Sequence, residues 1–322
     1  MIGFLLRRFA ASLLLLLLVL TVTFFILRLI PGDPMHLFEG QRLTLAQQQK
    51  LKQIYGLDRP LLEQYAAWLA AVGLRGDFGT SLSQQRPVSS ALLDALPATA
   101  ILASAALAVE YAAALMLGVA AARRRRSAVD HAIRIGTLLL YSQPSFWLGL
   151  MVILLFSYVW PVLPASHMHS VSAEFLGPAG RFFDLLRHLT LPAMVLGLSN
   201  AGGTTRFVRA SLIEVMSQDY IRAARAKGLS ELRVVWVHGM RNAAVPLIQL
   251  LALSLPALLS GALITEVVFS WPGLGQLTFN SILARDYPLI LGATALSATL
   301  VILGNLLADI LHAVVDPRVR HA

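Results

Sequence analysis

The sequence contains no cysteine, and only 13% of its 322 residues are charged. The absence of cysteine excludes disulfides, thiolate metal sites and thiol catalysis. The shortage of charge excludes an ordinary soluble domain, in which roughly a quarter of the residues are charged. A hydrophobic fraction of 57% indicates an integral membrane protein.

Apolar runs long enough to cross about 30 Å of hydrocarbon, roughly 20 residues each, predict about six transmembrane helices. The first run follows Arg7-Arg8, but its apolar core is too long for a signal peptide, so we expect it to remain as a membrane anchor. The fourth is the weakest, because polar and glycine residues interrupt it. The predicted fold class is all-α and polytopic, with spans near 9–30, 98–122, 136–160, 189–208, 243–269 and 288–313.

Basic residues gather in alternate flanks of these spans, which sets the expected orientation. With the N-terminus in the cytoplasm, the cytoplasmic segments contain sixteen of the 26 Lys and Arg residues. Both termini are then predicted to be cytoplasmic. The net charge of +9 and the run Arg123 to Arg126 are explained by this topology and by contact with anionic lipid. We expect no nucleic-acid partner.

The segment 31–97 is predicted to form a small external cap, too short for an independent core. Thr44 is a suitable N-cap for a helix that Gly56 closes. A second helix is expected over Leu61 to Val72. Its apolar face is predicted to contain Leu62, Tyr65, Ala66 and Leu69.

Two further external loops contain residues that could bind a metal ion or lie at the membrane interface. The loop 161–188 contains His167 and His169, which could bind a soft or borderline metal ion. No carboxylate or thiolate flanks them at ligand spacing, so a plain surface pair is favoured and no metal site is assigned. The aromatic residues of the loop 270–287, among them Trp271 and Tyr287, could simply be interfacial anchors, an interpretation that needs no further function.

A polar stretch from Ser217 onward predicts a short helix over Asp219 to Lys227. Ser217 is the expected N-cap, and the carboxylate of Asp219 lies where the helix dipole is positive. Gly228 supplies the left-handed residue that ends the helix. A second helix is expected to begin at Ser230, with one apolar stripe formed by Leu232, Val235, Trp236 and Gly239.

From physical chemistry alone, two interpretations of this stretch remain open. A short helix with small residues and flanking cations can enter the cleft of a soluble partner closely. An amphipathic loop helix lying on the membrane surface has the same composition.

Ala223-Ala224 followed by Gly228 resembles the Ala-Ala-x-x-x-Gly core of the ATPase-docking loop of ABC import permeases. The wider stretch is similar to the dipeptide, oligopeptide and nickel branch. Arg222 stands where many permeases have Glu, and Arg241 where Pro is usual, which is normal for this branch. The resemblance implies docking residues Asp219, Tyr220, Arg222, Ala223, Ala224, Arg225, Ala226, Lys227 and Gly228, with loop support from His238, Arg241, Asn242 and Pro246.

The resemblance extends over nearly the whole chain. Its further motifs are Pro31-Gly32-Asp33-Pro34, Gly76-Asp77-Phe78-Gly79, Arg86-Pro87-Val88, Pro97-Ala98-Thr99, Phe269 to Gly275, Arg285 to Pro288 and Asp316-Pro317-Arg318. It implies a type I importer permease fold in the inner membrane: residues 1–30 form the first helix, 31–97 the cap, and 98–322 the core with the docking loop at about 217–242.

The same resemblance implies the partners: a second, homologous permease chain in a heterodimer, two cytoplasmic ATPases and an external substrate-binding protein. The chain has no phosphate-binding Gly-x-x-x-x-Gly-Lys segment, so it is not expected to be an enzyme or to hold a cofactor. ATP and Mg²⁺ belong to the ATPases. Peptide is the default substrate, and nickel or another small solute is the alternative.

A secondary transporter without ATPase partners is the alternative from a different class. It would require several intramembrane charges as ion or proton sites, and few are present. A membrane-embedded enzyme lacks any nucleophile or metal constellation.

Glu110 lies near the middle of the second span, where an acidic residue costs roughly 2.5 to 3.5 kcal/mol on insertion scales. Three explanations remain open. The side chain is neutral, it pairs with a cation on a neighbouring helix, or it faces a water-filled pathway. A buried structural hydrogen bond would explain its presence without any role in the pathway.

Overall fold

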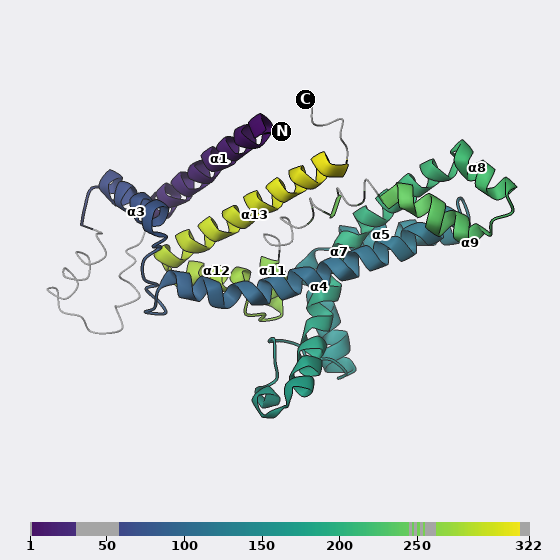
Figure 1. Ribbon diagram of the computed structural model, residues 1–322. Helices are drawn as coiled ribbons and strands as arrows, with labels where there is room; N and C mark the ends of the chain where they lie inside the picture. The colour runs from purple at the N-terminus through teal and green to yellow at the C-terminus, as the bar shows by residue number, and fades with distance from the viewer. Residues whose placement is uncertain are drawn as a thin grey trace. The chain divides into compact units, whose positions relative to one another are not determined.

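The computed structural model describes residues 2–29, 58–244 and 262–315, together with residues 247, 250, 251 and 254. The expected helix between Thr44 and Gly56, Pro246 and part of the span 243–269 lie outside the described residues. All regular elements within the described part are helical, which confirms the all-α fold (Figure 1). The principal helices are α1 (Ile2–Leu29), α3 (Leu61–Arg75), α4 (Val88–Arg123), α5 (Ala128–Ser142), α6 (Ser145–Ile153), α7 (Pro178–Met216), α8 (Asp219–Ala226), α9 (Glu231–Arg233), α11 (Leu263–Val268), α12 (Leu274–Leu283) and α13 (Tyr287–Val315).

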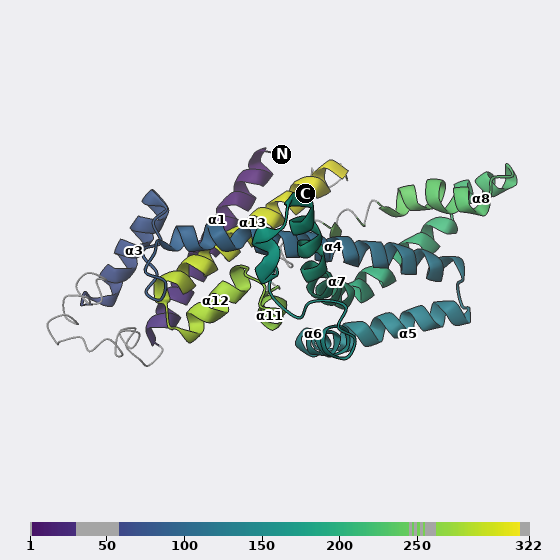
Figure 2. The same cartoon turned by 90° about the horizontal axis from the view of Figure 1, so that it is seen from below.

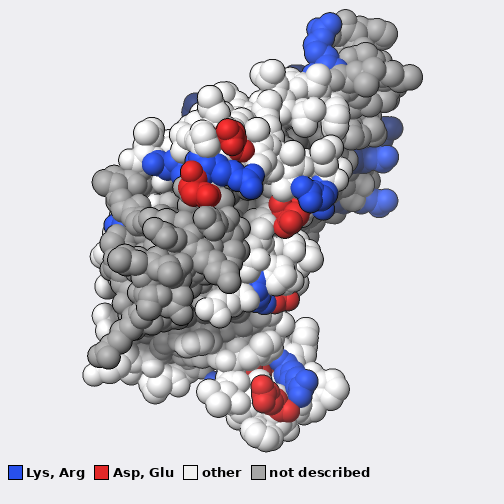
Figure 3. Space-filling model, turned by 90° about the vertical axis from the view of Figure 1, so that its left-hand side faces the viewer, with Lys and Arg blue, Asp and Glu red and all other residues white. Residues whose placement is uncertain are grey.

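Four of these helices, α1, α4, α7 and α13, are long and apolar enough to cross a membrane. Many of their large apolar side chains are exposed within the single chain, as expected for surfaces that face lipid or a partner. The described residues on the face shown in Figure 3 are mostly uncharged, and their basic and acidic side chains lie in small groups.

The third expected span, 136–160, is not one straight helix. The chain bends by 100° between Ala128–Ser142 and Ser145–Val159, so α5 is seen along its length in Figure 2 while α6 is seen nearly end-on. Pro144 causes the break, because it has no N–H to donate and it disfavours the helical conformation of the residue before it. Gln143 is accordingly extended, with ψ 139°. Apolar run length carried no information about this bend.

The chain divides into two compact units. Unit 1 comprises Met1–Ala98 and Pro272–Ile302, and unit 2 comprises Thr99–Trp271 and Leu303–Ala322. Each unit has hydrophobic clusters of its own.

In unit 1, α3 packs on α1 through aromatic side chains. The ring of Phe24 lies 5.3 Å from that of Tyr65 and 5.6 Å from that of Trp68. The expected apolar face of α3 is therefore partly wrong, because Leu62 and Ala66 are exposed. The helix also runs past Val72 to Arg75 and ends at a left-handed glycine, Gly76.

A buried carboxylate holds the chain segment before α4 against the start of α13 in unit 1. Asp286 is fully buried and accepts hydrogen bonds from the hydroxyls of Ser81 and Ser83, at 2.6 and 2.7 Å, and from the Ser83 N–H at 2.9 Å. Its other oxygen accepts from the Leu289 N–H at 3.2 Å. These four bonds account for the aspartate of the Arg285 to Pro288 motif.

Trp271 and Tyr287 do not act as exposed interfacial anchors. Trp271 is fully buried, and Tyr287 is 5% exposed. Ser270 has φ 49°, and this turn brings the Trp271 N–H to within 2.8 Å of the Glu266 carbonyl. The expectation for these two aromatic residues is thus wrong.

In unit 2, α7 lies very close to α4 and α5 at glycine positions. A Cβ at Gly197 would lie 2.6 Å from the carbonyl oxygen of Ala106 in α4, and one at Gly202 would lie 2.6 Å from that of Thr137 in α5. Both obstacles are backbone atoms, which cannot move aside as a side chain can. Small residues permit this kind of close approach between membrane helices, which explains the interrupted apolar pattern of the fourth span.

We expect Gly197→Ala to destabilise the protein by about 1–3 kcal/mol, the usual effect of forcing a methyl group into a packed interface. The matched control is Gly203→Ala on the same helix, where a Cβ would meet nothing within 4 Å. The measurement is the Tm of each purified variant in detergent. Equal Tm values for the two variants would contradict the close approach of α4 and α7.

Candidate functional site

The polar stretch after α7 folds into a helical hairpin, which we define as residues 217–242. Its first arm, α8, spans Asp219–Ala226, with Lys227 at its C-cap, and Gly228 has φ 76°; the expected helix and its glycine end are confirmed. Ser217 is not the N-cap. Gln218 holds that position, while the Ser217 hydroxyl donates to the Glu214 carbonyl at the end of α7.

A small apolar core joins the two arms of the hairpin. Ile221 and Ala224 of the first arm pack with Val234 of the second, and Ala224 is only 7% exposed. The neighbouring Ala223 and Ala226 are exposed. The three alanines therefore lie on two faces: one inside the hairpin and two at its surface.

The buried face of the second arm is only partly the expected one, because Val235 and Gly239 are buried as predicted whereas the other two residues of the stripe are not. It begins with α9 and continues as a π-helical turn, η4 (Val234–Gly239). A π turn bonds i to i+5 and so carries more residues per turn than an α-helix, which shifts the stripe. Leu232 and Trp236 are exposed, while Val234 and Val235 are buried.

The second arm packs on the core of unit 2. Val235, Met240 and Ala243 belong to one cluster with Val208 and Leu212 of α7. That cluster also includes Ala114 and Val119 of α4. The hairpin is thus fixed to two long membrane helices by apolar contact.

Polar contacts link the two arms. The Asn242 amide donates to the Tyr220 hydroxyl at 2.7 Å and, more weakly, to the His238 carbonyl at 3.4 Å. The Arg225 guanidinium pairs with Glu231 at 2.7 Å. Sequence reasoning named Tyr220 and Asn242 separately and missed that they touch.

The exposed face of the hairpin is rich in cations. Arg222 pairs with Asp219 one turn earlier, at 3.0 Å. No ion pair is recorded for Lys227, Arg233 or Arg241 within the described residues, and all three are exposed. The hairpin therefore presents small side chains and positive charge to whatever contacts it.

Glu110 lies between α4 and α7 in unit 2. It is 3% exposed, and the Thr204 hydroxyl donates to its Oε1 at 2.6 Å. No ion pair with a cation is found for it within the described part of the chain. The geometry favours the structural hydrogen bond.

Sequence reasoning missed two other buried acidic side chains in unit 2. Glu266 accepts from the Thr99 hydroxyl at 2.8 Å. Asp130 forms a two-pronged ion pair with Arg209, 2.7 Å at each contact, and accepts from the Arg126 N–H. An acidic residue within an apolar or basic stretch of sequence could have indicated both side chains. The sequence analysis considered such a residue only at Glu110.

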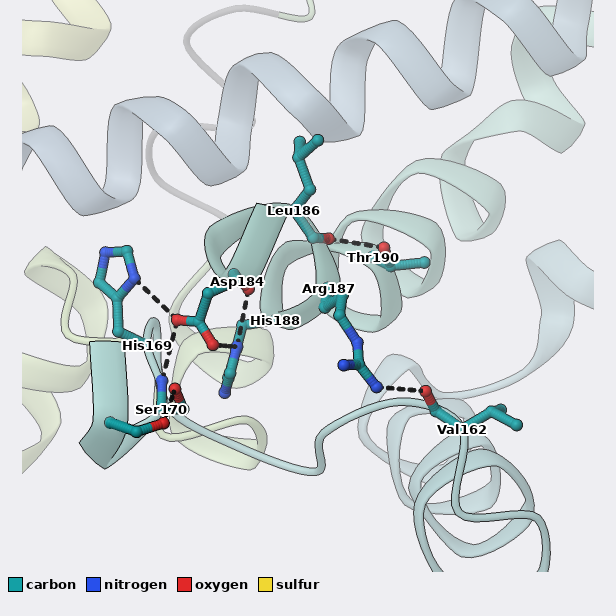
Figure 4. A network of polar contacts seen from close by, with 9 residues as sticks. Val162, His169, Ser170, Asp184, Leu186, Arg187, His188 and Thr190 are labelled. Atoms are coloured by element: carbon teal, nitrogen blue, oxygen red, sulfur yellow. Dashed lines mark hydrogen bonds and ion pairs between the residues drawn. The ribbon is translucent and has the colours of Figure 1, made fainter. Parts of the chain in front are cut away.

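The two loop histidines lie in separate environments. His167 contacts the Ser166 hydroxyl, whereas His169 lies 3.1 Å from Asp184 (Figure 4). The Asp184 carboxylate also accepts the Ser170 N–H and faces His188. No group of three or more metal-ligating side chains occurs among the residues the structure describes. The network fastens the loop to the first turns of α7.

Comparison with known proteins gives full-length matches. A family model described as a binding-protein-dependent transport system inner membrane component matches residues 114–321, and its N-terminal companion matches residues 1–103. The oligopeptide transport system permease protein AppB of Bacillus subtilis is 38% identical over 322 residues, covering 100% of both chains. The dipeptide transport system permease protein DppB of Escherichia coli is 37% identical, covering 100% of this chain and 99% of that protein.

We expect Glu110→Gln to leave stability unchanged, because the amide oxygen can still accept the Thr204 hydroxyl. Glu110→Leu removes that acceptor and is expected to cost about 1–3 kcal/mol. The measurements are the Tm of each variant and its rate of solute uptake in proteoliposomes. Loss of uptake by Glu110→Gln at normal Tm would show that the charge acts in transport.

Proposed function

The chain belongs to the family of binding-protein-dependent transport system inner membrane components, and from that membership we propose that it forms half of the pathway of an ATP-driven peptide importer. As a permease of ABC importers it is a multi-pass membrane transport component and not an enzyme. The observation that carries the docking proposal is the hairpin packed on α4 and α7, with its small, basic outer face.

We assign the docking contact to the exposed face of α8. Ala223 and Ala226 allow a partner surface to approach closely, and Arg222, Lys227 and the neighbouring cations suit an acidic partner surface. The remaining residues of the assignment support this face: Ala224 fills the hairpin core, Arg225 pairs across it, and Gly228 makes the corner. His238, Arg241 and Asn242 belong to the supporting arm.

Motion of the partner ATPases would pass to the membrane helices through apolar packing. A push on α8 is transmitted by Ile221 and Val234 to the second arm. That arm shares a cluster with α4 and α7, through Val235 and Leu212 among others. Because packed clusters repack in discrete steps more readily than they deform, this contact suits a switch between outward and inward access.

The proposed assembly contains a second homologous permease chain, two cytoplasmic ATPases that hold ATP and Mg²⁺, and an external binding protein. Both termini and the hairpin lie in the cytoplasm in this arrangement. The basic residues of the hairpin agree with the rule that cytoplasmic segments near membrane helices are rich in Lys and Arg.

Peptide is the proposed substrate. The two relatives described above are named as dipeptide and oligopeptide permeases, and they match this chain over its full length. A third relative, from Pseudomonas aeruginosa, is 39% identical and is named a di/tripeptide permease. A secondary transporter is disfavoured by the buried carboxylates of unit 2, since the structure gives Glu110, Glu266 and Asp130 hydrogen-bond donors from the protein itself.

We expect Ala223→Trp to reduce ATP-driven uptake by at least about tenfold. A bulky residue on the docking face should cost the contact roughly 1–3 kcal/mol, whereas membrane insertion and the hairpin core stay intact. Uptake is measured in proteoliposomes containing both permeases, the ATPases and the binding protein. Ala70→Trp, at an exposed position of α3, is the matched control.

Two results would contradict this proposal. Normal coupling of ATP hydrolysis to uptake by Ala223→Trp would place the contact elsewhere. Uptake by the chain alone, driven by an ion gradient, would overturn the importer function.

The substrate prediction has a test of its own. The binding protein that copurifies with the assembled permease is expected to carry a bound peptide, detectable by mass spectrometry after denaturation. Recovery of stoichiometric Ni²⁺ without peptide would favour the nickel alternative.

A further inference from the structure

Unit 1 contains a cavity of about 380 Å³ at the end where α1 finishes and α13 begins. Three helices line it: Arg28 comes from α1, Trp68 from α3 and Tyr287 from α13. The proposed docking contact makes no use of this cavity, because the hairpin lies in the other unit.

The cavity has hydrogen-bond donors without acceptors. The Trp68 indole N–H and the Tyr287 hydroxyl are both buried and have no hydrogen-bond partner in the structure, and Tyr287 as a whole is only 5% exposed. An indole nitrogen can only donate. Leaving such a group unpaired costs about 1–3 kcal/mol, so two of them on residues that line one cavity favour a ligand that accepts.

A cation lies with these donors. The Arg28 guanidinium is 5.4 Å from the centre of the Phe24 ring and 5.9 Å from that of Tyr287, and no carboxylate pairs with it among the described residues. Cation–π contact holds the guanidinium in place but leaves its N–H donors available. The ligand that satisfies all three groups is an anion.

The net charge of the cavity and its apolar lining indicate which kind of anion fits. The charged side chains that line the cavity are Arg28, Arg59 and Asp77, a net charge of +1, which one carboxylate neutralises and a phosphate dianion would reverse. A guanidinium fork also matches the planar carboxylate. Phe24, Phe78 and Leu291 add apolar wall, which suits an apolar body behind the charged group.

We propose that this cavity binds a small monocarboxylate with an apolar body, its carboxylate held by Arg28, Trp68 and Tyr287. Occupancy would join α1, α3 and α13 through one ligand. The cavity residues lie in unit 1 and the docking contact in unit 2, so the proposal does not depend on the docking assignment.

The test measures thermal stabilisation of the full-length chain in its assembled complex, in phosphate-free maltoside detergent. N-acetyl-phenylalanine is the probe, and N-acetyl-phenylalaninamide is the same molecule without the carboxylate. We expect the acid to raise Tm by about 2–4 °C at about ten times its Kd, and the amide to have no effect. Stabilisation by the amide, by inorganic phosphate or by added phosphatidylglycerol in place of the acid would overturn the carboxylate assignment.

Three variants connect the effect to the cavity. Tyr287→Phe and Trp68→Phe remove a donor and keep an aromatic ring, and each should weaken binding of the acid by about tenfold or more. Without ligand, Tyr287→Phe should be at least as stable as the parent, because it deletes a buried unpaired hydroxyl. Arg28→Gln should abolish the stabilisation.

The matched controls are Arg75→Gln and Tyr158→Phe, at exposed positions outside the cavity. Both should keep the full response to the acid. An unchanged response in all three cavity variants would remove the site. An equal loss of stabilisation by the acid in the two control variants would also contradict the site, because the effect would then arise from overall charge or from the detergent.

Discussion

The close approach of α7 to α4 and α5 is the constraint on which the rest of unit 2 depends. α7 contains 39 residues, a length of roughly 58 Å at 1.5 Å per residue, and Gly197 and Gly202 allow it to meet the backbones of α4 and α5 near its middle. One end of this helix fastens the loop around Asp184, and the other leads into the hairpin. A contact made at the hairpin therefore bears on a helix whose position leaves little freedom to slide.

Close helix packing also explains how the cost of burying acidic side chains between membrane helices is offset. Glu110 and Glu266 each accept a hydroxyl hydrogen bond from a threonine on a neighbouring helix, which offsets part of the cost of removing the carboxyl group from water. Thr204 can reach Glu110 because α7 lies so near α4. Burial cost alone could not distinguish such a bond from a place in the solute pathway, since both predict an acidic residue in an apolar span.

Features governed by local sequence could be predicted, and features governed by distant contacts could not. The helix α8 and its end at Gly228 follow from capping, dipole and glycine rules that act within one or two turns. The π turn after α9 and the burial of Trp271 leave no periodic signal in the sequence. Pro144 marked the bend between α5 and α6, but a helix containing proline can also continue, as α4 does through Pro97 and α7 through Pro192.

The motif Ala-Ala-x-x-x-Gly illustrates how one pattern of small residues serves three separate physical requirements. Ala223 is exposed, so its small size matters to whatever approaches α8. Ala224 packs against Val234, so its size is set by the inside of the hairpin. Gly228 has open space around it but φ 76°, so it is required by backbone conformation and not by volume. Since the three residues do not share a surface, a substitution at each one perturbs a different property: contact, packing or the angle of the corner. The spacing identifies the hairpin, but only the structure indicates which of its small residues can touch a partner.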